Sequence, residues 1–106
     1  MTNQEIAKIL YELAAFYEMQ NVPFKPRAYE KAALAVESFD HEAEEVYKEK
    51  GFEGFLEIAG IGHGIAGHVE ELVKTGQLKI YEQLRRKIPV NLSELLQIES
   101  LGPKRI

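Results

Sequence analysis

The chain has 106 residues, of which 45% are hydrophobic and 28% charged, with 8 Gly and 4 Pro. This size and composition predict one compact folded unit and exclude disordered or collagen-like chains. There is no cysteine, which excludes disulfides, thiol catalysis and thiolate metal sites. The net charge is −4, but the charges are unevenly distributed: residues 1–72 carry 6 Lys/Arg and 14 Asp/Glu, whereas residues 73–106 carry 7 Lys/Arg and 3 Asp/Glu. The chain can therefore still present a basic surface to a polyanion.

Apolar residues recur at helical spacing along the whole chain, and no stretch alternates as a strand would. The expected fold is therefore all-α, a small helical bundle. Helices are expected over residues 3–20, 26–39, 41–50, 53–59, 65–75, 78–87 and 93–98. No apolar run approaches the roughly 18 residues that a membrane span requires, so no membrane partner is expected.

Local signals predict where several of these helices begin and end. Thr2 and Glu5 have the spacing of a capping box at the start of the first helix. Asp40 is the expected N-cap of the third helix, and Gly76 is the expected left-handed residue that ends the fifth. The second helix has an alanine-rich inner face, which predicts that it lies at the centre of the bundle.

Residues 55–69 have the pattern of a helix-hairpin-helix motif. Gly60 and Gly62 are expected to adopt backbone angles closed to other residues, and Ile61 to point inward and hold the turn to the core. Ala66 would let the two helices pack closely. The backbone N–H groups at the start of the second helix would then face outward and bind phosphate oxygens, without reading base sequence.

A second, incomplete copy of this hairpin follows forty residues later, with Ser100 in place of the first glycine. It contains Gly102 and is followed by Lys104, both candidates for DNA contacts. Because the chain stops before a second helix of this copy forms, we expect a helical DNA-binding domain over residues 1–88 and the start of a following subdomain over residues 89–106.

Four blocks in order resemble the N-terminal region of family X DNA polymerases: Arg27–Ala33, the first hairpin, Leu72–Leu78 and the Leu-Gly-Pro hairpin. The resemblance extends from about residue 3 to residue 106. It implies sequence-independent binding of single-stranded or gapped DNA and its 5′-phosphate end, in gap-filling DNA repair. It also implies a monomer that acts in the cytoplasm at the nucleoid, joined to the rest of a polymerase chain.

The chemistry of nucleotidyl transfer is absent from this sequence. Carboxylates that hold two metal ions are needed for that reaction, and the chain has a single aspartate, Asp40. A divalent metal is therefore expected only in polymerase domains beyond this chain, and the chain itself is expected to be an N-terminal piece without polymerase activity.

The resemblance also assigns roles to particular residues. A monovalent cation, Na⁺ or K⁺, would be held by the backbone carbonyls of Leu56, Ile58 and Ile61. The DNA contacts on the hairpin would come from Gly60, Ile61, Gly62, His63 and Gly64. A 5′-phosphate pocket would include Phe24, Lys25, Tyr29, Gly64 and Ile80, with His68 beside it. Phe24, Tyr29 and Tyr81 are candidates for stacking on unpaired bases, but for Tyr29 the favoured expectation is a half-buried place in the core with its hydroxyl near a phosphate.

His68 falls on the position of the Schiff-base lysine that some relatives use to remove a 5′-deoxyribose phosphate. An imidazole has no primary amine, so little or no lyase activity is expected. The alternative, an active lyase, would depend on Lys31, expected one turn beyond Tyr29, or on Lys25. His63 and His68 lie five residues apart with no third ligand, which disfavours a transition-metal site.

Two further alternatives stay open. The basic run Arg85–Lys87 would either contact phosphate or only increase solubility. The acidic residues 40–57 would either form a solvated outer surface or make the chain a protein-interaction module.

Overall fold

The computed structural model describes residues 1–87, which form six helices. They are α1 (Asn3–Met19), α2 (Lys25–Ser38), α3 (Ala43–Lys50), α4 (Phe52–Leu56), α5 (His63–Thr75) and α6 (Lys79–Lys87). No strand occurs within residues 1–87, and the all-α prediction is confirmed. The second hairpin with Gly102 and Lys104, and the whole of residues 89–106, lie outside the described residues.

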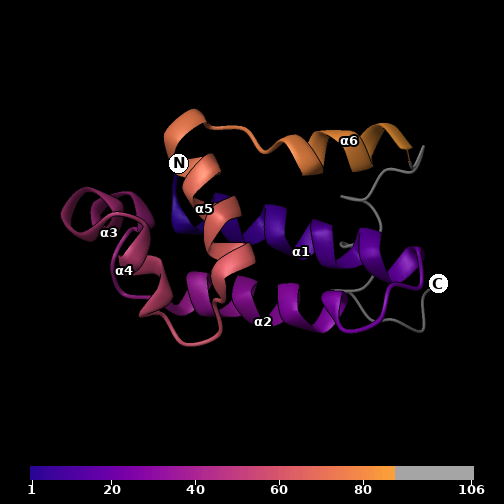
Figure 1. Cartoon of the computed structure of the whole chain (residues 1–106), viewed down its shortest axis with the longest axis horizontal. Helices are drawn as coiled ribbons and strands as arrows, with labels where there is room; N and C mark the ends of the chain where they lie inside the picture. Colours follow the sequence, from indigo (N-terminus) through magenta and orange to yellow (C-terminus); the bar gives the residue numbers. More distant parts are fainter. Residues whose placement is uncertain (88–106) are drawn as a thin grey trace.

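α1 and α2 pack side by side and antiparallel along the length of the molecule (Figure 1). The predicted capping box is present at the start of α1. The Thr2 hydroxyl accepts from the Glu5 N–H at 3.2 Å, and the Glu5 carboxylate accepts from the Thr2 N–H at 2.8 Å. Two backbone donors that the helix cannot satisfy internally are thereby paired.

The centre of the bundle is α1, and the prediction of α2 for that position was wrong. The α1 side chains that are almost fully buried include Ile6, Leu10, Leu13 and Phe16. In α2 the buried set consists of Tyr29, Ala32, Ala33 and Val36, while Leu34 is 56% exposed. The alanines allow α2 to approach α1 closely. The buried residues lie on one side of α2 only, so α2 is an outer helix.

The start of α3 is held by a side chain of α1. Asn3, which is 5% exposed, accepts the N–H of Ala43 on its Oδ1 at 2.7 Å and donates its amide to the His41 carbonyl at 2.7 Å. The N-cap of α3 is Glu42, without a side-chain cap bond of its own. The prediction of Asp40 as N-cap was therefore wrong, because a side chain from α1 caps this helix.

α4, the link over residues 57–62 and α5 form the hairpin. α4 is shorter than the expected helix over residues 53–59. The N–H groups of Glu57 and Ile58 bond to carbonyls three residues back, at 3.3 and 3.1 Å, which tightens the last turn and ends the helix. Gly76 ends α5 in the left-handed conformation as predicted, with φ 76° and ψ 4°.

A buried polar contact ties α6 to α1. The Tyr81 hydroxyl donates to the Glu12 carboxylate at 2.5 Å, and both residues are buried. Burial, then this hydrogen bond, raises the pKa of Tyr81 above its ordinary value, so the hydroxyl keeps its proton and stays a donor. The ring of Tyr81 is thus part of the core, and its predicted stacking on unpaired bases is wrong.

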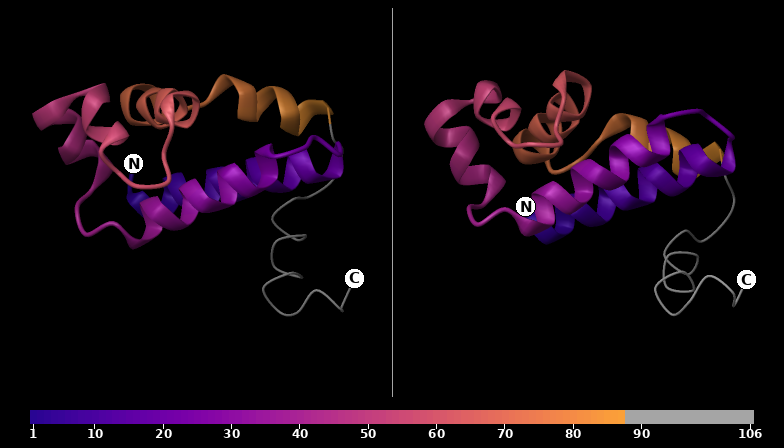
Figure 2. Two further views of the ribbon diagram at one scale, coloured as in Figure 1. Left: turned by 60° about the horizontal axis from the view of Figure 1, so that its bottom comes forward. Right: turned by 90° about the horizontal axis from the view of Figure 1, so that it is seen from below.

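The remaining arrangement follows from these contacts. α3 and α4 lie at one end of the α1–α2 pair, and α5 crosses the pair (Figure 2). α6 runs beside α1 toward the opposite end (Figure 1). None of the helices in residues 1–87 combines the length and the apolar character needed to cross a membrane.

Candidate nucleic-acid interface

The hairpin turn is held to the core by Ile61, which is 6% exposed and points inward as predicted. The Ile61 N–H donates to the Ile58 carbonyl at 3.1 Å, which closes the turn. Gly62 is the N-cap of α5, and its carbonyl accepts the Ala66 N–H at 2.8 Å as the first bond of the helix. Ala66 is fully buried where α4 and α5 pack together.

The first backbone N–H groups of α5 have no acceptor within residues 1–87. They belong to His63, Gly64 and Ile65, and Gly62 offers no side chain to cap them. Gly62, His63 and Gly64 are exposed. No acidic residue lies in the first turn of this 13-residue helix. The turn therefore presents unpaired donors at the positive end of a helix dipole, an arrangement that binds phosphate oxygens.

The two glycines of the turn have different roles. Gly60 has a φ of +100°, and because side chains disfavour this backbone angle the turn needs glycine at this position. Gly62 has φ −94° and ψ −178°, ordinary extended backbone, and a Cβ would meet nothing within 4 Å. The prediction of special backbone angles was right for Gly60 and wrong for Gly62.

The surface beside the free N–H groups carries no covering side chain. Gly64 and Gly67 lie in α5, where glycine costs about 1 kcal/mol relative to alanine. A Cβ at either position would meet nothing within 4 Å, so packing within the protein does not require glycine there. What the glycines do provide is room for another chain to approach the helix backbone.

A second group of predicted residues lies together between α2 and α5. The Lys25 ammonium is 4.9 Å from the centre of the Tyr17 ring, the Tyr17 and Tyr29 rings are 5.2 Å apart, and Tyr29 is 6.0 Å from the His68 ring. Lys25 is exposed and His68 is half-buried. Lys25, Tyr29 and His68, assigned to one pocket from the sequence, are thus neighbours in space.

The environment changes how two of these groups titrate. Burial, followed by the neighbouring Tyr17, raises the pKa of Tyr29 above its ordinary value. Burial lowers the pKa of His68; Glu71 acts in the opposite direction and Lys25 in the same direction. Neutral imidazole is therefore favoured in the unliganded protein. Tyr29 is 6% exposed, which agrees with the expected place of its ring in the core and not with stacking on bases.

Phe24 is the one predicted stacking residue that is exposed. Its side chain is 89% exposed, and its φ of +71° is a left-handed conformation that non-glycine residues rarely adopt. It directly precedes Lys25 at the start of α2. An aromatic ring held in solvent beside a lysine has the composition of a single-strand stacking platform.

Lys31 lies at the hairpin, which sequence reasoning missed. An ideal Cβ on Gly60 would lie 3.5 Å from the Lys31 Cγ, so the lysine side chain runs past the turn. Lys31 was expected one turn beyond Tyr29, near His68, but a separation of two residues places it on a different face of α2. Since 29 positions separate Lys31 from Gly60, no local pattern signals their proximity.

The other predicted positions are placed as follows. Leu56 ends α4, and Ile58 lies in the link, where its carbonyl already accepts one hydrogen bond. Ile80 is in α6 and half-buried. The basic end of α6, Arg85–Lys87, points toward the end of the molecule away from the hairpin (Figure 1). Within residues 1–87, no group of three His, Asp or Glu side chains could hold a metal ion.

The fold and the turn together define a helix-hairpin-helix protein of the all-α class. A family model for the helix-hairpin-helix domain matches residues 1–78, and the chain belongs to this family. The match begins at α1 and ends before α6, so the family unit includes the supporting helices as well as the hairpin. Domains of this kind bind DNA through its backbone. No curated protein matches the chain.

Proposed function

We propose that the hairpin binds the sugar–phosphate backbone of DNA without sequence preference. The observation that carries this proposal is the set of unpaired N–H groups at His63, Gly64 and Ile65 in the first turn of α5, where His63 and Gly64 are exposed and the glycines leave the approach open. The Lys31 side chain adds a positive charge beside the turn. Contacts of these kinds hold phosphate oxygens and are indifferent to the bases.

The preferred DNA is single-stranded or gapped, with a 5′-phosphate end. Lys25 supplies a cationic group for a terminal phosphate, the His68 ring beside it supplies an N–H donor, and the exposed ring of Phe24 supplies a face for an unpaired base. The resemblance to family X DNA polymerases supports the same substrate. In this reading the chain is the N-terminal domain of a gap-filling repair polymerase and acts as a monomer at the nucleoid.

A monovalent cation, Na⁺ or K⁺, would bridge the hairpin and the DNA strand. The carbonyls of Leu56, Ile58 and Ile61 belong to the end of α4 and the link over residues 57–62, and each carbonyl oxygen has two lone pairs. Ile58 uses one of its pairs within the turn, so one is left for a cation. Oxygen donors of this type suit hard cations.

Lyase activity is not part of the proposal. A Schiff base requires a primary amine, and by the resemblance to family X polymerases His68, whose ring lies beside Tyr29, replaces the lysine that forms it. Lys25 is the amine nearest this cluster, whereas Lys31 is at the hairpin. Borohydride treatment with an incised abasic oligonucleotide should give no covalent adduct; an adduct lost in Lys25→Arg would establish the lyase alternative.

Gly62→Leu tests the proposed DNA contact. The backbone at Gly62 is ordinary and its surroundings are open, so leucine should leave the fold intact while blocking the strand. Affinity for a 5′-phosphorylated gapped oligonucleotide should fall about tenfold, equivalent to loss of one or two phosphate hydrogen bonds. The measurement is fluorescence anisotropy at low salt, with single-stranded and nicked DNA as comparison substrates.

Gln83→Leu is the matched control. It adds the same side chain at an exposed position of α6 and should leave the affinity unchanged. In the wild-type protein, the amide resonances of residues 60–64 should shift on titration with DNA. If they do not move, or if Gly62→Leu binds as tightly as the control, the hairpin is not the DNA-binding surface.

A further inference from the structure

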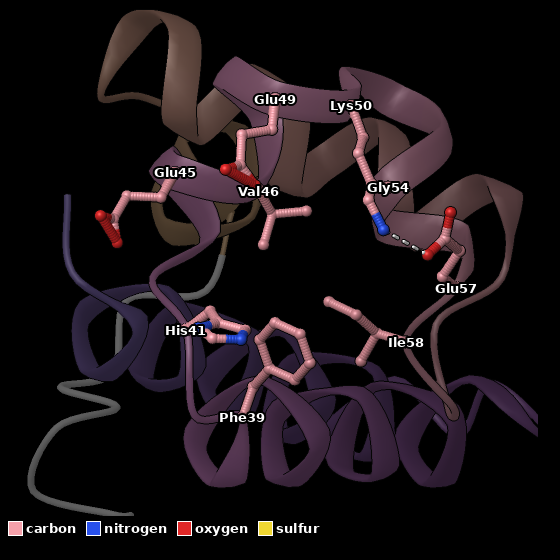
Figure 3. Close-up of a pocket in the computed structure, with 9 residues that line it drawn as sticks. All are labelled: Phe39, His41, Glu45, Val46, Glu49, Lys50, Gly54, Glu57 and Ile58. Atoms are coloured by element: carbon pink, nitrogen blue, oxygen red, sulfur yellow. Dashed lines mark hydrogen bonds and ion pairs between the residues drawn. The ribbon is translucent and has the colours of Figure 1, made fainter.

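A groove of about 430 Å³ lies where α3 and α4 face the end of α2 (Figure 3). Its floor is apolar: the side chains of Phe39, Val46 and Ile58 face the same space. These residues come from three different segments, the C-terminal end of α2, the middle of α3 and the hairpin link. The groove therefore has a hydrophobic surface that none of the six helices covers.

The rim of the groove is negatively charged. Glu45 and Glu49 are exposed on α3, and neither carboxylate makes a hydrogen bond or ion pair within residues 1–87. The one lysine at the rim, Lys50, is bound to Glu57 at 2.9 Å, so each neutralises the other. Over residues 40–57 there are 7 acidic residues against 2 lysines. The free charge at this surface is thus that of two carboxylates inside an acidic region.

This combination selects its occupant by charge. A nucleic acid is excluded, because phosphates would approach unpaired carboxylates at close range. The rim also lacks the grouped ligands that a metal ion needs within the described part of the chain. A peptide with an apolar side chain for the floor and Lys or Arg for the rim satisfies both features at once.

We propose that this groove docks a basic segment of a partner protein, one in which an apolar anchor is flanked by arginine or lysine. The anchor would contact Phe39, Val46 and Ile58, and the cationic side chains would pair with Glu45 and Glu49. The chain would then hold DNA at the hairpin and a protein partner in the groove, which Glu57 and Ile58 of the link help to line. The inference is independent of the DNA-binding proposal.

The test uses the protein over residues 1–106 and a fluorescein-labelled peptide in which Leu-Leu is flanked on both sides by Arg-Arg. Saturable binding is expected, with amide shifts at Val46 and Gly54 in the groove. The double variant Glu45→Gln/Glu49→Gln should bind about three- to tenfold more weakly, because two exposed charge pairs are lost. Binding of DNA to this variant should not weaken.

The matched control is Glu18→Gln/Glu30→Gln, which makes the same change in charge at exposed positions away from the groove. It should bind the peptide as the wild type does. Equal weakening in both double variants, or peptide-induced shifts confined to other helices, would overturn the proposal. So would tighter binding of a synthetic peptide of residues 88–106, or self-association that Glu45→Gln/Glu49→Gln abolishes, since the occupant would then be this chain itself.

Discussion

At Gly60 the backbone has a φ of +100°, and a Cβ there would lie 3.4 Å from Ala35 and 3.5 Å from the stem of Lys31. The angle acts against any other residue, whereas the two contacts are at ordinary van der Waals distance. At Gly67, in the middle of α5, neither condition holds. The two glycines thus serve different purposes: Gly60 makes the turn possible, and Gly67 leaves the helix surface open.

Gly60→Ala should lower the free energy of unfolding by about 1–2 kcal/mol through left-handed backbone strain. Gly67→Ala should raise it by about 0.5–1 kcal/mol, because alanine favours the helix and nothing obstructs its Cβ. Urea denaturation followed by circular dichroism measures both. A stable Gly60→Ala protein with an unchanged midpoint would mean that the turn does not depend on this backbone angle.

His68 makes stability depend on pH in a defined direction. Burial lowers its pKa below the ordinary value of 6.5. The unfolded chain therefore takes up this proton at a higher pH than the folded protein, and stability from the neutral ring is fully present above 6.5 and lost as the pH falls through the folded pKa. The effect reverses when a phosphate binds beside the ring, since an anion favours the protonated form.

Unfolding free energies of the wild type and His68→Gln, compared at about pH 7.5 and about pH 5, test this effect. The decrease on acidification should be smaller in His68→Gln, because glutamine does not titrate. The difference between the two proteins isolates His68 from the other groups that titrate in this range. Equal decreases in both proteins would show that His68 takes up its proton at the same pH folded and unfolded.

At the scale of elements, α3 depends on α1 for its N-terminal cap. Asn3 satisfies both the Ala43 N–H and the His41 carbonyl from a position that is 5% exposed. Asn3→Ala should cost about 1–3 kcal/mol, because it removes the cap and leaves two backbone groups without partners. Amide hydrogen exchange should show the loss of protection mainly in α3. Gln4→Ala, at an exposed position of α1, is the control and should change little.

This element also shows how far the sequence predicts the fold. The capping box at Thr2 and the left-handed Gly76 were predictable because each depends on residues within a few positions along the chain. The cap of α3 was not, because Asn3 and Ala43 are 40 positions apart and only the packed bundle brings them together. Asp40 had the strongest local signal for an N-cap, but the distant side chain of Asn3 caps the helix instead.

The same distinction holds in the candidate site. The hairpin was found from one contiguous stretch, and its inward Ile61 is confirmed. The position of Lys31 beside Gly60 depends on how α2 packs against the turn. The cluster of Lys25, Tyr29 and His68 was predictable only by resemblance, since spacing alone does not bring α2 and α5 together.

At the scale of the whole molecule, charge separates two surfaces on a protein whose net charge is −4. The region over residues 40–57 is strongly acidic, whereas the hairpin has Lys31 beside it and no acidic residue in the first turn of α5. DNA responds to the charge within roughly one Debye length, about 8–10 Å at physiological salt. The overall negative charge therefore does not prevent binding at the hairpin, but it slows approach from the acidic end.

This division of charge predicts how single lysines affect the salt dependence of DNA binding. Lys31→Gln removes a cation beside the hairpin, so the slope of log affinity against log salt for single-stranded DNA should become less negative by about 0.7, the value for one phosphate contact. Lys48→Gln removes the same charge from an exposed position of α3 and should leave the slope unchanged. Titrations at several salt concentrations separate the two outcomes. Equal slopes for both variants would mean that DNA senses only the total charge, and that the hairpin does not place Lys31 against a phosphate.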